Sequence, residues 1–154
     1  MKPRLNPYAA APDAMNAVTE LANYVADCGL EHSLLSLIKI RASQINGCAF
    51  CIHMHTRDAR AEGETEERIY LLDAWRESPL YTDRERAALT WTESLTLVAQ
   101  THVPDADYAI VSAQFSATEI AQLNVAIGLI NTWNRIAIAN RAVHPARASH
   151  AVSA

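Results

Sequence analysis

Apolar residues recur through most of the chain at intervals of three and four positions, which is the spacing of one face of an α-helix. No segment alternates strictly between apolar and polar residues, so the pattern does not predict a strand. Only four glycines in 154 residues also favour helix. The pattern predicts an all-α fold with helices over residues 13–28, 31–45, 48–61, 65–77, 82–100 and 104–114 and a long helix from Ser116.

Residues that favour helix ends mark several of these boundaries. Asp13 and Thr65 suit N-cap positions, and Asn46-Gly47 tolerates the left-handed conformation that closes a helix. Two segments have the spacing of a capping box, in which a Ser or Thr and a Glu three residues later cap each other. These segments are residues 82–85 and 116–119.

The long last helix is apolar on more than one side, because Val125 and Ile138 lie between the positions of its main apolar face. Such a helix is buried centrally or shared between subunits, and we favour the second interpretation. Residues 1–12 contain three prolines and are predicted to form an extended, loose arm. We therefore expect one helical domain over residues 13–144, followed by a tail at residues 145–154 that is disordered or locally docked.

Composition and charge exclude several classes of protein. The net charge of −4 and the lack of a run of basic residues argue against nucleic-acid binding. No apolar run reaches the roughly 18 to 20 residues that span a bilayer, so no membrane association is expected. The first residues lack the apolar core of a signal peptide, which predicts a cytoplasmic protein. In the cytoplasm, two cysteines that are close in sequence are more often catalytic or metal-binding than part of a disulfide framework.

The chemistry is concentrated between Asn46 and His55. On a helix that begins near Cys48, the side chains of Cys51 and His55 fall on the same stripe as Cys48, whereas His53 points elsewhere. The unpaired N–H groups at a helix start stabilise a thiolate, and a histidine one turn later can accept its proton. This combination predicts a redox site.

Two other interpretations compete with redox chemistry. His53 and His55 could complete a zinc site with the cysteines, but residues two apart on a helix point in nearly opposite directions, and no second ligand motif is present. The cysteines could also be core thiols. Cys28 is predicted to be such a buried, inert thiol. The other histidines are expected at the surface: His32, His102, His144 and His150.

The run Arg41-Ala-Ser-Gln-Ile-Asn-Gly-Cys-Ala-Phe-Cys51, followed by His55, resembles the signature of the alkylhydroperoxidase D-like branch of the carboxymuconolactone decarboxylase family. Residues 75–78 and 85–93 are also similar to one-domain members of this family, and the resemblance covers about residues 30–135. It implies a single-domain helical bundle, assembled as a trimer or hexamer, with thiol-dependent peroxidase or disulfide-reductase activity. The cysteine pair favours this redox branch over the decarboxylases.

The resemblance implies that Cys48 and Cys51 form the dithiol and that His55 belongs to a proton relay. The family also has a glutamate twelve residues before the first cysteine, where this chain has Ser36. A serine can hold a water but cannot act as a carboxylate. Glu93 is the preferred replacement, because it interrupts a largely apolar helix. Glu85 and Glu31 are the alternatives.

The sequence therefore predicts a cytosolic enzyme that reduces hydroperoxides through a dithiol/disulfide cycle. The expected partners are a hydroperoxide substrate and a dithiol electron donor, either a thioredoxin-like or a lipoyl protein. No cofactor or metal is expected. The alternative is a redox sensor with the same fold and little turnover, and its main support is the serine at position 36.

Overall fold

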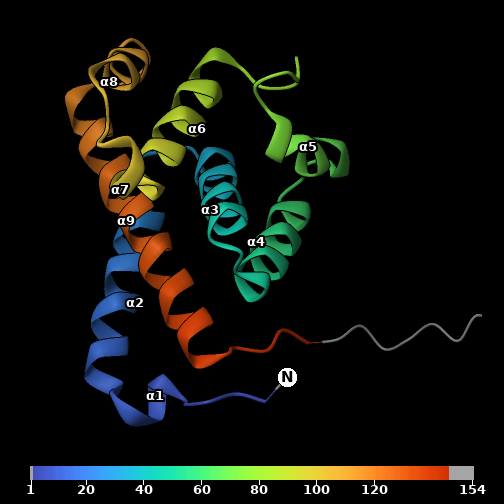
Figure 1. The fold of residues 1–154 in the computed structure, drawn as a ribbon, viewed down its shortest axis with the longest axis vertical. Helices are drawn as coiled ribbons and strands as arrows, with labels where there is room; N and C mark the ends of the chain where they lie inside the picture. Colours follow the sequence, from blue (N-terminus) through green and yellow to red (C-terminus); the bar gives the residue numbers. More distant parts are fainter. Residues whose placement is uncertain (1, 146–154) are drawn as a thin grey trace, which may run out of the picture.

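The computed structural model describes residues 2–145, which form a bundle of helices without any strand (Figure 1). This confirms the predicted all-α fold. Most of the predicted tail lies outside the described residues. The elements in chain order are α1 (Pro7–Ala10), α2 (Pro12–Ala26), α3 (His32–Asn46), α4 (Ala49–Ala61), α5 (Glu66–Leu71), the 3₁₀ turn η1 (Leu72–Ala74), α6 (Asp83–Thr96), α7 (Val98–Thr101), α8 (Asp105–Ser112) and α9 (Ala117–Asn140).

Helix α3 lies at the centre of the bundle and packs against α4, α6 and α9. Its apolar side chains contribute to two hydrophobic clusters. One cluster joins α3 to α2, α6, α8 and α9, and includes Leu34, Leu35 and Ile38. The other joins α3 to α4, α5, η1 and α6, and includes Leu37 and Ile40. Because both faces of α3 are covered, the helix corner that follows it has a fixed position.

The helix ends agree well with the local sequence signals. Both predicted capping boxes are present, at Thr82 with Glu85 and at Ser116 with Glu119. Gly47 closes α3 with a φ of 68°, in the left-handed region that glycine adopts without strain.

Three predicted boundaries are wrong. The helix expected over residues 65–77 ends at Leu71 and is followed by the 3₁₀ turn η1. Asp13 lies in the first turn of α2, and Ala11 occupies the N-cap position. Residues 82–100 form two helices, because the ψ of 28° at Leu97 leaves the helical region. The Thr101 hydroxyl donates a hydrogen bond to the carbonyl oxygen of Ser94, 2.7 Å away, at this break.

The N-terminal arm is not extended throughout, contrary to the prediction. The carboxamide oxygen of Asn6 accepts hydrogen bonds from the first N–H groups of α1. The Arg4 N–H donates to the carbonyl oxygen of Asn140 at 2.9 Å, and the Arg4 guanidinium donates to that of Ala139 at 3.2 Å. The arm therefore passes beneath the C-terminal end of α9 and is attached to it (Figure 1).

Helix α9 has buried side chains on one face, such as Leu123 and Ile127. Val125 and Ile138 remain 37% and 46% exposed, so apolar side chains also lie on its solvent face, as predicted. None of the helices in the described part of the chain is long and apolar enough to cross a membrane.

Candidate functional site

The cysteine pair lies at the corner between α3 and α4. The Cys48 N–H donates to the carbonyl oxygen of Ser43 at 3.0 Å, in the turn that Gly47 allows. Cys48 is the N-cap residue of α4, and its sulfur accepts a hydrogen bond from the Cys51 N–H at 3.3 Å. The two cysteines form a disulfide, with their Cα atoms 5.3 Å apart. The helix start is where the sequence predicts it, and it brings the two sulfurs together.

Both cysteines are buried: Cys48 is 1% exposed and Cys51 is 2% exposed. The disulfide is therefore largely shielded from solvent. The Cys48 sulfur faces one of the N–H groups at the helix start. Only Cys51 of the pair lines the adjacent pocket, so a substrate in this pocket meets Cys51 first.

The pocket has a volume of about 440 Å³ and lies between α2 and α9 on one side and α3 and α4 on the other, with the N-terminal arm as a further wall. Its lining is largely apolar. Cys51 and His55 both face it from α4, and Lys39 faces it from α3. An apolar cavity with a few convergent polar groups is the usual form of a small-molecule site.

His55 follows Cys51 by one helical turn and is partly buried. Burial and, to a smaller extent, the nearby Lys39 ammonium lower the pKa of His55 to about 4, although the Asp58 carboxylate acts in the opposite direction. The imidazole is consequently neutral at pH 7 and can accept a proton. The shared lining of the pocket agrees with the predicted common stripe of the cysteine and the histidine.

Lys39 lines the pocket but was not predicted as a site residue from the sequence. It stands between Ile38 and Ile40, which are both fully buried. Burial lowers the pKa of Lys39, and Glu62 and Asp58 partly oppose this effect. The signal was a single lysine within an apolar helical run, a pattern that also fits a lysine extending its charge to the surface.

The acids proposed for the relay lie elsewhere. The Glu93 carboxylate accepts hydrogen bonds from the Trp75 indole at 2.8 Å, from Arg41 at 2.9 Å and from Arg76 at 2.7 Å. These bonds offset the effect of burial, so the pKa of Glu93 is lowered. Glu93 does not line the pocket. Its role in the structure is to connect α6 to α3 and to the segment after η1.

The other residues considered for the proton relay also bind groups other than His55. The Ser36 hydroxyl donates to the Glu62 carboxylate at 3.4 Å and faces a separate cavity. Glu85 pairs with Arg68 at 2.6 Å, and Glu31 pairs with Arg84 at 2.7 Å. Asp58, three residues after His55 on α4, is the acid that acts on the imidazole.

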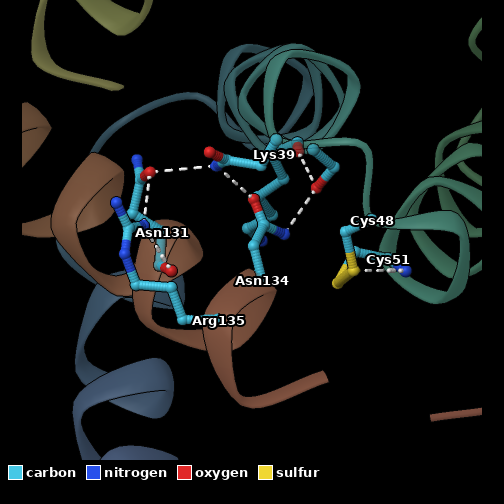
Figure 2. The surroundings of a disulfide bond; sticks show 8 residues. Lys39, Cys48, Cys51, Asn131, Asn134 and Arg135 are labelled. Carbon is cyan, nitrogen blue, oxygen red and sulfur yellow. Dashed lines mark hydrogen bonds between the residues drawn. A yellow bond between two sulfur atoms is a disulfide. The ribbon is translucent and has the colours of Figure 1, made fainter. Parts of the chain in front are cut away.

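A buried polar network fastens α9 to the corner before Cys48 (Figure 2). The Asn46 amide donates to the side-chain oxygen of Asn134 at 2.8 Å and to that of Asn131 at 3.0 Å. Asn134 donates in turn to the Ser43 hydroxyl at 3.0 Å. Two asparagines at an i, i+3 spacing in an apolar helix, Asn131 and Asn134, were the signal of this network in the sequence, but the spacing does not reveal their partners.

The remaining cysteine and histidines lie outside this site. Cys28 is a free, partly exposed thiol, so the prediction that it is buried is wrong. His53 stacks on His144 with their ring centroids 4.7 Å apart, and His144 is only partly exposed. His32 and His102 are exposed, and His150 lies outside the described residues. Among residues 2–145, no group of three or more potential ligands could hold a metal ion.

The fold and the site define an all-α protein whose dithiol/disulfide pair borders an apolar pocket. Residues 12–94 match the carboxymuconolactone decarboxylase family, and the chain belongs to this family. Within the family, its structure and its cysteine pair place it with the AhpD-like proteins.

Individual relatives agree with this assignment. The chain is 44% identical to the uncharacterized protein YdfG of Bacillus subtilis (strain 168) over 144 residues, which cover 92% of this chain and 98% of the relative. A crystal structure from Agrobacterium tumefaciens, of a protein of unknown function proposed to be the antioxidant defence protein AhpD, is 50% identical, with a TM-score of 0.93 over 95% of this chain and all of that one.

A more distant structure shares the fold alone. It is an uncharacterized peroxidase-related protein from Silicibacter sp. TM1040, with 24% identity and a TM-score of 0.76. The alignment covers 87% of this chain and 71% of that one.

Proposed function

We propose that this protein is a thiol peroxidase that reduces organic hydroperoxides through a cycle between a dithiol and a disulfide at Cys48 and Cys51. The observation that carries the proposal is that Cys51 and His55 face the same apolar pocket, while Cys48 lies behind Cys51 within bonding distance. The relative from Agrobacterium tumefaciens, proposed to be an antioxidant defence protein, supports an oxidoreductase of this kind.

Each residue has a distinct task in the proposed reaction. Neutral His55 takes the proton of the Cys51 thiol, directly or through water. The thiolate attacks the outer oxygen of the hydroperoxide, the O–O bond breaks, and the alkoxide leaves as an alcohol with the proton from His55. Cys51 is then a sulfenic acid, and the Cys48 thiol attacks its sulfur. The disulfide forms and water is released.

An external dithiol completes the cycle by thiol–disulfide exchange, which reduces the Cys48–Cys51 disulfide and oxidises the donor. A thioredoxin-like or lipoyl protein has the required chemistry. We propose a cytoplasmic location, where such reductants are kept reduced.

Steady-state consumption of cumene hydroperoxide, with dithiothreitol as the donor, tests the activity. We expect sustained turnover that Cys51→Ser abolishes, and that Cys48→Ser reduces to the level set by direct attack of the donor on the sulfenic acid. If both variants keep the wild-type rate, the proposed function is wrong.

A redox sensor is the second candidate, because no carboxylate hydrogen-bonds to His55 among residues 2–145 and its pKa is low. A weak base gives slow turnover. A sensor oxidises once for each reduction by its partner and shows no sustained consumption of peroxide. The same steady-state assay therefore separates the two candidates.

We also propose that the protein assembles as a homo-oligomer, a trimer or hexamer. Large apolar side chains that remain exposed on the last three helices support this: Val98 on α7, Tyr108 and Ile110 on α8, and Val125 and Ile138 on α9. Such side chains are typical of subunit interfaces when they form a common surface. Light scattering on the purified protein should give a multiple of 16.9 kDa, and a mass of 16.9 kDa would contradict assembly.

A further inference from the structure

Lys39 is a cation without a partner at the wall of the apolar pocket. Within residues 2–145, its ammonium has no hydrogen bond and no ion pair, and the acids that act on it, Asp58 and Glu62, lie beyond ion-pair distance. Lys39 is partly buried, and a charge that loses part of its contact with water without gaining a partner is unfavourable. An anion in the pocket would supply the missing partner.

The rest of the pocket suits the apolar part of a ligand. Its walls include Val25 from α2, Leu129 and Trp133 from α9, and Leu5 from the N-terminal arm. The volume of about 440 Å³ lies within the range of roughly 300 to 1,000 Å³ that is common for small-molecule sites. The apolar walls and a single ammonium together select a ligand with an apolar body and one negative charge.

We propose that this pocket binds apolar monocarboxylates, with the carboxylate paired to Lys39 and the hydrocarbon part held between α2, α9 and the arm. A carboxylate fits better than a phosphate, because one ammonium balances its single negative charge, whereas a phosphate carries about −1.5 to −2 and usually binds to several donors. Lys39 is the only Lys or Arg side chain among the described lining residues. If the protein is also the proposed peroxidase, its favoured substrates are apolar hydroperoxides that carry a carboxylate; this extension rests on the proposed function.

Calorimetric titration of the oxidised protein with octanoate and with octan-1-ol tests the binding site. The disulfide state contains no Cys51 thiolate, so thiol chemistry does not affect the result. We expect octanoate to bind more tightly than octan-1-ol. Lys39→Met should weaken octanoate binding by about 10- to 100-fold, as expected for the loss of a charge-assisted hydrogen bond, and change octan-1-ol binding by less than about threefold. Lys39→Arg should restore octanoate binding in part.

Lys2, the other lysine of the chain, is exposed and provides the matched control, because Lys2→Met should leave both affinities unchanged. A second measurement needs no variant. Acetylation of wild-type protein, mapped by mass spectrometry, should be slowed by octanoate at Lys39 but not at Lys2, and octan-1-ol should protect neither.

Equal affinity for octanoate and octan-1-ol, or acetylation of Lys39 that octanoate does not slow, would overturn the inference. Neither result concerns peroxide reduction, so the proposed function would stand. Conversely, octanoate binding that depends on Lys39 in a protein without peroxidase activity would uphold the binding site and refute the peroxidase.

Discussion

Cys51 and His55 lie one turn apart on α4 and face the same apolar pocket, and the environment of the histidine keeps it neutral. The combination matters because a neutral imidazole accepts a thiol proton, whereas an imidazolium cannot. The low pKa that ensures neutrality also makes His55 a weak base. At pH 7, His55 is therefore always in the neutral form that can accept a proton, but it is a weak base.

Removing this base should slow the reaction without abolishing it. His55→Gln is expected to lower the rate of Cys51 oxidation by cumene hydroperoxide by about 10²- to 10⁴-fold at pH 7, the usual contribution of general-base catalysis. Stopped-flow measurement on the reduced protein gives this rate. His53→Gln is the matched control, because His53 stacks on His144 and does not line the pocket. Equal effects of the two variants would remove His55 from the mechanism.

The environment of His55 also predicts how stability depends on pH. Burial lowers the folded-state pKa from 6.5 to about 4, so between these values the unfolded chain binds a proton that the folded protein does not. The free energy of unfolding should thus fall as the pH falls through this window, by up to about 3 kcal/mol, and His55 should contribute no pH dependence above about pH 7. Urea unfolding of the oxidised protein at pH 7 and pH 4.5 measures the loss, which should be smaller in His55→Gln. An equal loss in both proteins would show that the imidazole is not held neutral.

Glu93 is expected to act in stability and not in catalysis. Glu93→Gln removes the charge that three donors share, which should lower the free energy of unfolding by about 1–3 kcal/mol. The peroxidase rate of the folded variant should stay within about threefold of wild type, a barrier change below about 1 kcal/mol, because Glu93 does not line the pocket. Glu77→Gln, at an exposed glutamate on the surface, should change neither quantity. A large loss of rate in fully folded Glu93→Gln would restore its relay role.

The asparagine network should hold the cysteine corner in place. Asn134→Ala removes the hydrogen bonds of Asn134 with Asn46 and with the Ser43 hydroxyl, and is expected to cost about 1–3 kcal/mol of the free energy of unfolding. Hydrogen exchange should also become faster at the N–H groups of residues 47–51 in the reduced protein. The control is Asn23→Ala, at an exposed position of α2, which should have little effect on either measurement. Unchanged exchange in Asn134→Ala would mean that α9 does not position the corner.

Local sequence signals were enough to predict most of the helices and the place of the cysteine pair. A capping box such as Thr82 with Glu85, or a glycine such as Gly47 at a helix end, acts over a few residues, and its outcome depends little on the rest of the fold. The break at Leu97 was not predictable in this way, because the apolar spacing continues across it.

The pocket could not be predicted because it joins segments that are far apart in the chain. Pro3 and Ala142 both line it, and no periodicity relates them. The partners of Glu93 could not be predicted either, because they also lie far away in the chain. Glu93 was predicted as a relay acid from its place in an apolar helix. Arg41 lies 52 residues before it, and only the packing of α3 on α6 brings the two together.

A single turnover of the reduced protein tests the central claim most directly. Cys28→Ser leaves Cys48 and Cys51 as the only thiols, because the chain has three cysteines. After reduction and removal of the donor, one equivalent of cumene hydroperoxide is added, and both thiols and cumyl alcohol are measured. We predict that both thiols disappear as one equivalent of alcohol forms and that an intramolecular Cys48–Cys51 disulfide results. Thiols that persist, with no alcohol above the level of Cys51→Ser, would contradict the account.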